Sequence, residues 1–112
     1  MVTKEQFMKG LYDFIERDMV PKSSGNYKII LNVAKAAIKH NPDAVFNTIK
    51  ANGFISMLGV FDENDHIDVE SLSHILSEGF GSDEFEFGFK FLGKEYCLHL
   101  SGTDIQTLKR YM

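Results

Sequence analysis

Apolar residues recur at helical spacing through most of the chain and at strand spacing near its C-terminal end. Phe7 is followed by apolar residues four, seven and eight positions later, which places all of them on one side of a helix. These are Leu11, Phe14 and Ile15. Thr3 and Gln6 have the spacing of a capping box, in which each side chain bonds a backbone N–H at the start of a helix. The pattern predicts a helix over 3–18 that ends before Pro21.

A second helix is predicted over 26–39, and its pattern differs from the first. Polar residues form one narrow stripe, while apolar residues occupy most of the remaining circumference. The stripe consists of Lys28, Asn32, Lys35 and Lys39. We expect a central helix that packs on more than one side, with only the lysine edge in water.

Four further segments carry helix and turn signals. Asn41 and Pro42 suit the N-cap and first position of a third helix, which Asn52 and a left-handed Gly53 would end. Residues 54–58 predict one more helical turn. A polar turn over 62–65 and a brief extended piece at 66–67 follow. Asp68 is the expected N-cap of a helix from Val69 to about Glu78, with Gly79 as its stop, and the expected inward residues are Val69, Leu72, Ile75 and Leu76.

The clearest local signal is a period-two alternation typical of a half-buried strand. It comprises Phe85, Phe87, Phe89 and Phe91, and continues at Tyr96, Leu98 and Leu100. A tight turn centred on Gly93 and Lys94 would put every apolar residue on one face, whereas a shift of one residue would mix the faces. The expected pairs are Phe91 with Tyr96, Phe89 with Leu98 and Phe87 with Leu100.

A last helix is predicted from Thr103, which forms a capping box with Gln106, to the C-terminus. It should bury Ile105, Leu108 and Met112 or Tyr111, and pack on the phenylalanine face of the hairpin, because an isolated hairpin is marginal in water. The predicted fold class is α+β: a mainly helical N-terminal two-thirds, then a C-terminal antiparallel β-hairpin covered by helices, including a short terminal helix. We expect residues 1–112 to form a single globular domain.

Composition favours an ordinary cytoplasmic protein. The chain is 44% hydrophobic and 25% charged, as globular proteins are. Its one cysteine, Cys97, excludes an intramolecular disulfide and indicates a reducing compartment. Neither a signal peptide nor a run of about 20 apolar residues is present, so no membrane association is expected.

Charge is divided unevenly along the chain. Residues 1–52 hold eight Lys/Arg against five Asp/Glu, or +3, and residues 53–112 hold four against eleven, or −7. Opposite faces could therefore attract partners of opposite sign, including a second copy, although charge on a surface also falls this way by chance.

No catalytic residue, metal or cofactor is predicted. An EF-hand loop starting at Asp62 would need glycine and glutamate where Ile67 and Ser73 stand. His66 with Asp65, Asp68 and His74 matches no known zinc-ligand spacing. Phosphate-binding, dinucleotide-binding and metalloprotease motifs are missing from the sequence, and so is a nucleophile elbow.

Two surfaces are candidates for binding. Cys97 and His99 share a hairpin face, opposite Lys90 and Gly88 in the expected register, but lie about 7 Å apart along the strand, too far for a nucleophile and its base. That face is instead a candidate interaction surface, and Gly88 would let a partner backbone approach. Its residues are Glu86, Gly88, Lys90, Cys97 and His99. The second candidate, a nucleic-acid edge, consists of Lys28, Lys35 and Lys39, with Lys22 and Lys50 nearby. Overall acidity disfavours nucleic acid as a partner, since a wet helix edge also explains these lysines.

The second half of the chain carries a weak resemblance. Its residues are Leu58-Gly59-Val60, the turn from Asp62 to Asp65, Ile67-Asp68-Val69-Glu70 with Leu72, the Gly93 hairpin, and Asp104-Ile105 with Leu108 and Tyr111. In this order of features the chain resembles small uncharacterised proteins of Firmicute-type bacteria and their prophages or mobile elements. The resemblance covers about half the chain and implies a helical N-terminal part, a C-terminal hairpin and helix, and no established activity.

The sequence favours a small non-enzymatic interaction or accessory protein of phage origin. Its expected partner is another protein, or a second copy bound through the oppositely charged halves or an exposed hairpin edge. Two alternatives remain: a nucleic-acid-associated regulator that uses the lysine edge, and a metal-dependent or thiol enzyme.

Overall fold

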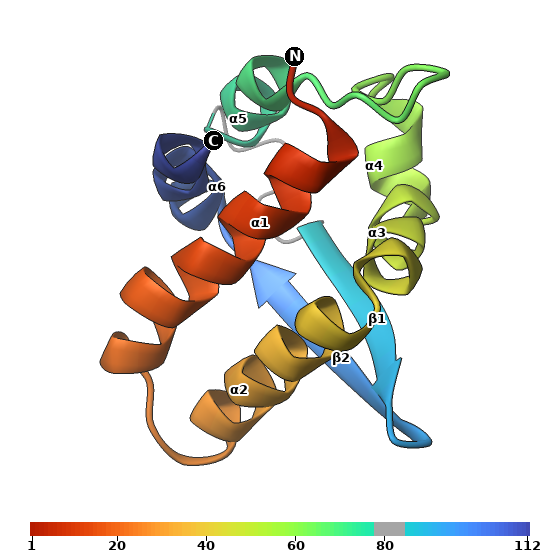
Figure 1. Ribbon diagram of the computed structural model, residues 1–112. Helices are drawn as coiled ribbons and strands as arrows, with labels where there is room; N and C mark the ends of the chain where they lie inside the picture. Colours follow the sequence, from red (N-terminus) through yellow and green to blue (C-terminus); the bar gives the residue numbers. More distant parts are fainter. Residues whose placement is uncertain (78–84) are drawn as a thin grey trace.

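The computed structural model describes residues 1–77 and 85–112 (Figure 1). A series of helices precedes one antiparallel hairpin, and a short helix follows it. The elements are α1 (Lys4–Phe14), the π-helical turn η1 (Ile15–Met19), the 3₁₀ turn η2 (Val20–Lys22), α2 (Gly25–His40), α3 (Pro42–Lys50), α4 (Gly53–Met57), α5 (Val69–Ser77), β1 (Phe85–Phe91), β2 (Lys94–Leu100), α6 (Gly102–Leu108) and the 3₁₀ turn η3 (Lys109–Tyr111). The predicted α+β class is confirmed.

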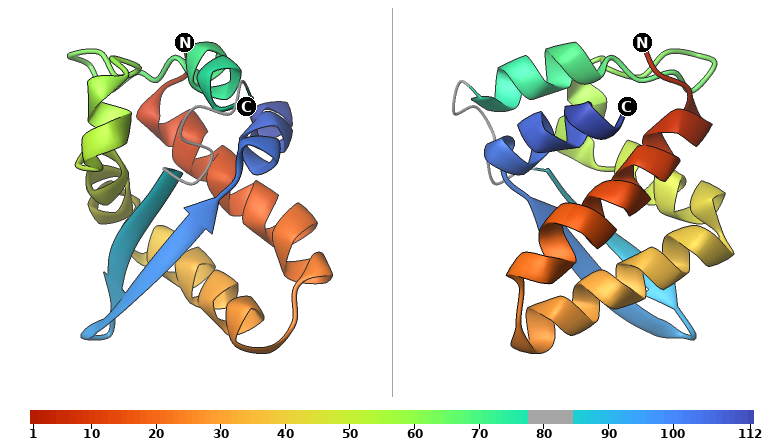
Figure 2. Two further views of the ribbon diagram at one scale, coloured as in Figure 1. Left: turned by 180° about the vertical axis from the view of Figure 1, so that it is seen from behind. Right: turned by 60° about the vertical axis from the view of Figure 1, so that its left-hand side comes forward.

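Helices cover one face of the hairpin and leave the other open. α2 crosses the inner face and contacts both strands, while α3 runs beside β1. α1 packs on α2, α3 and α6. From behind, the hairpin lies in front of the helices and nothing in the described chain covers it (Figure 2).

The core forms where the inner face of the hairpin meets these helices. The strands contribute Phe85, Phe87, Phe89, Leu98 and Leu100, all buried. Leu31, Ala34, Ala37 and Ile38 of α2 are buried in the same cluster. Burial of such side chains is the main favourable term in folding, at roughly 25 cal/mol per Å² of apolar area.

The start and end of the first helix follow from two local devices. The Thr3–Gln6 capping box is confirmed: Gln6 N donates to Thr3 Oγ1 at 3.1 Å, and Thr3 N donates to Gln6 Oε1 at 2.8 Å. After Phe14 the helix widens into η1. Pro21 cannot continue the helical ladder because it lacks an N–H, and the Ser23 hydroxyl donates to Met19 O at 2.8 Å instead.

The hairpin register differs from the prediction by two residues. The central turn residues are Leu92 and Gly93, with φ of 52° and 78°, the signature of a type I′ turn. Phe89 therefore faces Tyr96, Phe87 faces Leu98, and Phe85 faces Leu100. A shift of two preserves the faces, so the prediction that the apolar residues share one side is confirmed.

The observed register also pairs acidic side chains with basic ones across the strands. Lys90 lies opposite Glu95, and Glu86 lies opposite His99. The predicted register would have placed Cys97 opposite Lys90 and left these charges unmatched. Because directly opposed charges of unlike sign stabilise an antiparallel pair, the outer face favours the observed register.

Two predicted helix ends were wrong. Gly53 is not a left-handed stop: it begins α4, and Asn52 caps that helix by accepting from Ile55 N at 3.0 Å. Thr103 lies inside α6 and is not its cap. Ser101 caps α6 and forms a capping box with Asp104, so the helix starts one residue before the predicted position.

The second helix packs on fewer sides than expected. Leu31, Ala34, Ala37 and Ile38 are buried, but Ile29 is 60% exposed and Tyr27 is 41% exposed. The first turn of α2 contacts β2, where the Tyr27 hydroxyl donates to His99 O at 3.4 Å. The buried residues of α2 begin at Leu31, and residues 25–30 before it are exposed or only partly buried.

The polar turn and the Asp68 cap are confirmed. Ile67 forms isolated bridges with Val2 and Phe61, which is the brief extended piece expected there. Ser71 N donates to Asp68 Oδ1 at 3.1 Å at the start of α5. The predicted stop at Glu78 and Gly79 and the side chain of Leu76 lie outside the described residues.

Across residues 1–77 and 85–112, none of the helices combines the length and apolar character that crossing a bilayer requires.

Candidate interaction surface

The outer side of the hairpin gathers every residue of the predicted interaction surface. We call it the open face, and it consists of Glu86, Gly88, Lys90, Glu95, Cys97 and His99. Alternation along β1 and β2 turns these side chains away from the phenylalanine face. Cys97 lies opposite Gly88, and His99 lies opposite Glu86, which corrects the expected partners Lys90 and Gly88.

Charges on the open face are paired across the strands but remain in water. Lys90 Nζ lies 3.6 Å from Glu95 Oε1, and both side chains are largely exposed. His99 Nδ1 lies 4.0 Å from Glu86 Oε2. Exposed pairs of this kind contribute little stability, about 0–1 kcal/mol, so a partner can exchange them for its own charges at low cost.

The Cys97 thiol has the opposite character to a catalytic nucleophile. Burial and the nearby Glu86 carboxylate raise the pKa of Cys97 above its ordinary value. A reactive cysteine needs a neighbouring positive charge that lowers its pKa and produces the thiolate. Cys97 therefore stays a neutral thiol at neutral pH.

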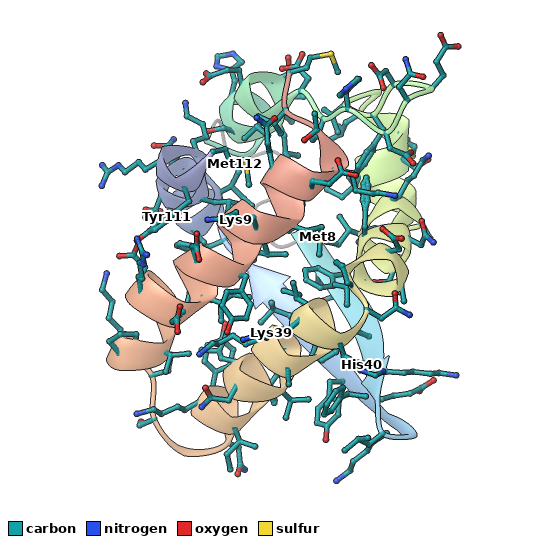
Figure 3. The ribbon with its side chains drawn as sticks, in the orientation of Figure 1. Met8, Lys9, Lys39, His40, Tyr111 and Met112 are labelled. Atoms are coloured by element: carbon teal, nitrogen blue, oxygen red, sulfur yellow. The ribbon has the colours of Figure 1, made fainter. Side chains whose placement is uncertain are left out.

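A groove separates β1 from α3 and the end of α2. It has a volume of about 780 Å³ and is lined mostly by apolar and small side chains. We call it the β1 groove, and its helical wall consists of Ala37, His40, Asn41, Ala44, Val45 and Thr48. Figure 3 labels His40 where α2 ends beside the hairpin. Sequence reasoning missed this wall, because α3 carries only an ordinary amphipathic pattern and nothing in it indicates which strand it will face.

The predicted nucleic-acid edge does not form a uniform basic surface. Lys35 is only 19% exposed: its ammonium lies 3.7 Å from Glu16 and 5.5 Å from the centre of the Tyr12 ring. Lys28 and Lys39 are exposed on either side of it. The two neighbouring lysines are also paired, Lys22 with Asp18 and Lys50 with Asp65.

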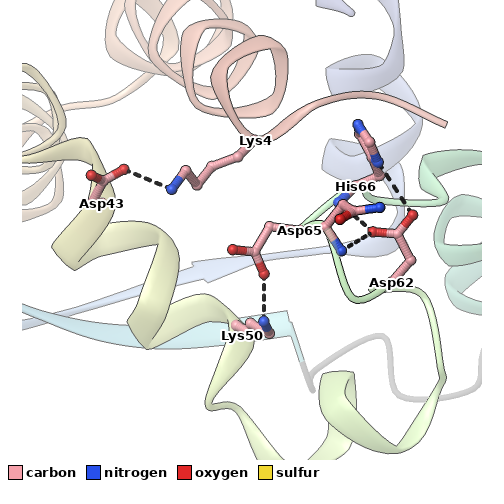
Figure 4. A network of polar contacts seen from close by, with 7 residues as sticks. Lys4, Asp43, Lys50, Asp62, Asp65 and His66 are labelled. Atoms are coloured by element: carbon pink, nitrogen blue, oxygen red, sulfur yellow. Dashed lines mark hydrogen bonds and ion pairs between the residues drawn. The ribbon is translucent and has the colours of Figure 1, made fainter.

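The acids of the 62–68 segment already have partners within the protein (Figure 4). Asp62 Oδ1 accepts from His66 N at 2.8 Å and from Asn64 N at 2.9 Å, and these bonds, with that of His66 N first, lower the pKa of Asp62. Asp65 pairs with Lys50, and Asp68 caps α5. Within the described ranges, no three of the His, Cys, Asp and Glu side chains are placed to hold a metal together.

A second hollow of about 400 Å³ lies between α1 and the junction of α2 with α3. Met8 and Ile38 form its apolar floor, and lysines and acids alternate on its rim. Lys4 bonds Asp43 at 3.1 Å and Lys9 bonds Asp13 at 3.2 Å, so the rim charges largely satisfy each other. This hollow therefore offers no clear charge preference for a ligand.

Comparison of the chain with protein-family models, with curated proteins and with solved structures finds no match.

Proposed function

We propose that this chain is a small non-enzymatic interaction or accessory protein that binds another protein, or a second copy of itself, through the open face of its hairpin. One observation carries the proposal. The hairpin is a two-stranded sheet with helices on one side, and in the described chain its other side is open to solvent. A sheet that presents both a bare face and bare strand edges is a template for association.

The composition of the open face supports protein binding. Acidic Glu86 and Glu95 alternate with basic Lys90 and His99 across this surface, and Gly88 leaves its centre low. Mixed charge around a small uncharged centre suits a partner that matches position and sign. In a two-fold pair of copies the same pattern can meet itself, with acids facing bases. A bacterial or prophage origin stays a prediction.

Light scattering tests self-association directly. We expect the mean mass of the purified protein to rise with concentration, and Cys97→Arg to weaken the association about tenfold, because a buried unpaired charge is costly at an interface. Asn47→Arg is the matched control, since it adds the same charge at an exposed position on α3 outside the open face. Equal effects of the two variants would contradict a role for the open face.

Binding to other proteins is tested by a separate experiment. Display of a random library of folded protein fragments should yield binders that lose affinity for Cys97→Arg and keep it for Asn47→Arg. A chain that remains monomeric at every concentration and selects only binders indifferent to Cys97→Arg would overturn the proposed function.

A further inference from the structure

The outer edge of β1 presents backbone groups that the hairpin does not use. Leu92 and Gly93 form a two-residue turn, so the flanking residues Phe91 and Lys94 exchange hydrogen bonds. Hydrogen-bonded and non-hydrogen-bonded pairs alternate along an antiparallel ladder. Gly88 and Lys90 belong to the non-bonded pairs and therefore aim their N–H and C=O groups away from β2.

These groups face the β1 groove. Gly88 and Lys90 line it together with Ala44 and Thr48 of α3. In the described chain, neither residue makes a backbone hydrogen bond outside the hairpin. The groove thus has a strand edge for one wall and a helix for the other.

Both ends of the groove are closed by side chains. At one end, Asn52 Nδ2 donates to Glu86 O. Glu86 O is the next carbonyl of β1 that points away from β2, and this bond already uses it. At the other end, the His40 ring meets the Phe91 ring edge-to-face, with centroids 6.3 Å apart. Between these two ends, the backbone groups of β1 without a hydrogen-bond partner in the described chain are therefore limited to Gly88 and Lys90. A stretch of this length can pair with only a few residues of a peptide.

We propose that the β1 groove binds a short extended peptide segment of a partner protein, which adds to β1 as a third, antiparallel strand. This inference rests on the proposed function and assigns the partner's conformation and chemistry. Donors and acceptors that repeat every second residue along an edge are matched only by an extended backbone. Antiparallel pairing is the commoner arrangement and gives perpendicular hydrogen bonds to both residues.

The walls determine which side chains the segment carries. Its residue opposite Lys90 is acidic, because directly opposed unlike charges are favourable and Lys90 has only the exposed Glu95 to lose. Its residue opposite Gly88 is aromatic and covers the gap that glycine leaves beside Cys97. The residues opposite Phe87 and Phe89 point toward the Ala44 side and are β-branched and apolar. From N- to C-terminus the segment reads acidic, β-branched, aromatic, β-branched.

A folded second copy fits the groove poorly. Its own β1 is flanked by its own α3, so two copies paired along β1 would bring two α3 helices onto the same side of one continuous sheet. A single extended segment has no such neighbour. The open face and the β1 groove therefore bind different partners or different parts of one partner.

A tethered probe tests the groove while the natural partner is unidentified. The segment Glu-Val-Tyr-Val is fused behind Met112 through a flexible Gly/Ser linker of about 25 residues, whose root-mean-square span is roughly 27 Å. The molecule measures 32 × 26 × 23 Å, so the linker reaches the groove, and tethering raises the local concentration to about the millimolar range. Amide hydrogen exchange followed by NMR reads the result.

We expect the Gly88 and Lys90 amides to exchange at least about tenfold more slowly with the probe than with a linker ending in Pro-Val-Pro-Val, whose prolines stand opposite Lys90 and Gly88 and lack the N–H groups that the pairing needs. The amides of Glu95 and Cys97, on the outer edge of β2, should keep their rates. Protection at the β2 edge, or none at Gly88 and Lys90, would overturn the inference.

Substitutions give an independent control. Ala44→Trp fills the groove and should abolish the protection, whereas Asn47→Trp places the same ring on an exposed part of α3 outside the groove and should leave it intact. Lys90→Pro removes one groove-facing N–H and should also abolish it, and Glu95→Pro is the matched change on β2. If Lys90→Pro prevents folding, the test depends on Ala44→Trp and Asn47→Trp alone. Protection that survives Ala44→Trp would then contradict binding in the groove.

This experiment separates the inference from the proposed function. Loss of association in Cys97→Arg with an unprotected β1 edge would leave the proposed function standing and overturn the groove. If Gly88 and Lys90 are protected but Cys97→Arg does not change association, the groove would stand and the proposed role of the open face would be overturned.

Discussion

Leu92 is the residue whose side chain suits its backbone least. Its φ is 52°, in the left-handed region that costs an ordinary L-residue about 1–2 kcal/mol, and its side chain is 90% exposed and gains no packing in return. Asn-Gly is the preferred sequence of a type I′ turn. Leu92→Asn should therefore raise the free energy of unfolding by about 1 kcal/mol, measured by urea denaturation. Leu92→Ala is the control: it keeps the backbone cost, so equal stability of the two variants would contradict this account.

Asp62 makes the stability of the turn depend on pH. Its pKa in the folded protein lies below the ordinary value of 3.8, chiefly because its carboxylate accepts the His66 N–H. A depressed pKa means that ionised Asp62 stabilises the fold above pH 3.8, and that this contribution disappears as the pH falls through the folded-state pKa. Asp62→Asn should therefore destabilise the protein at pH 7, and the difference from wild type should shrink below about pH 4.

Chemical denaturation at a series of pH values measures this difference. Glu63→Gln is the control, because Glu63 is exposed in the same turn and makes no hydrogen bond in the described structure. A gap between wild type and Asp62→Asn that stayed constant from neutral to acidic pH would show that the charge is unimportant.

At the scale of single elements, the start of α6 provides a matched pair of substitutions. Ser101 Oγ accepts from Asp104 N at 3.1 Å, and Ser101 N donates to Asp104 Oδ2 at 2.9 Å. Ser101→Ala removes the cap and should cost about 1 kcal/mol in the free energy of unfolding. Thr103→Ala should change stability by a few tenths at most, because Thr103 lies within the first turn and its side chain caps nothing. A larger loss for Thr103→Ala would restore the cap expected from the sequence.

Sequence patterns predicted the kind and approximate extent of most elements because those depend on local spacing. The Thr3 and Asp68 caps, the helix that starts at Pro42 and the alternation of the strands are all local signals. The register of the hairpin was predicted with an error of two because either Leu92 or Lys94 must adopt a left-handed backbone beside Gly93, and neither residue prefers it. Pairing of Glu86 with His99 and Lys90 with Glu95 distinguishes the two registers.

At the scale of the whole molecule, the C-terminal turn η3 closes onto α1. Gly10 leaves room for this contact, since a Cβ there would lie 2.9 Å from Met112 Cγ and 3.1 Å from Tyr111 O. The Tyr111 hydroxyl also donates to Asp18 Oδ2. Figure 3 shows Tyr111 and Met112 beside the middle of α1.

Gly10→Ala should therefore destabilise the protein by about 1–3 kcal/mol, although alanine alone favours a helix by about 1 kcal/mol over glycine. Met112→Ala removes both crowding atoms of Met112, Cγ and Cε, and leaves Tyr111 O, so the double variant should recover part of the loss. Urea denaturation of the four members of this cycle measures the coupling. Strictly additive effects would mean that Gly10 and Met112 do not share this contact.

The candidate site was only partly predictable because it combines local and distant features. Period-two alternation alone is enough to place Glu86, Gly88, Lys90, Cys97 and His99 on one face, and the folded hairpin has that face. The β1 groove depends on α3 lying beside β1, a contact between segments about 40 residues apart that no local pattern encodes. Likewise, the helical pattern of 26–39 predicted an exposed Lys35. Its partner Glu16 lies in a different element, and the local pattern does not show that the two meet.

The contact between Gly10 and Met112 also constrains how this protein can mature on the ribosome. α1 is synthesised long before η3. The side of α1 that contacts η3 therefore stays exposed while the intervening residues are translated. Closing so long a loop is slow and leaves apolar surface exposed to other nascent chains. Residues 109–112 therefore cover this side of α1 only after all the elements between them and α1 have been synthesised.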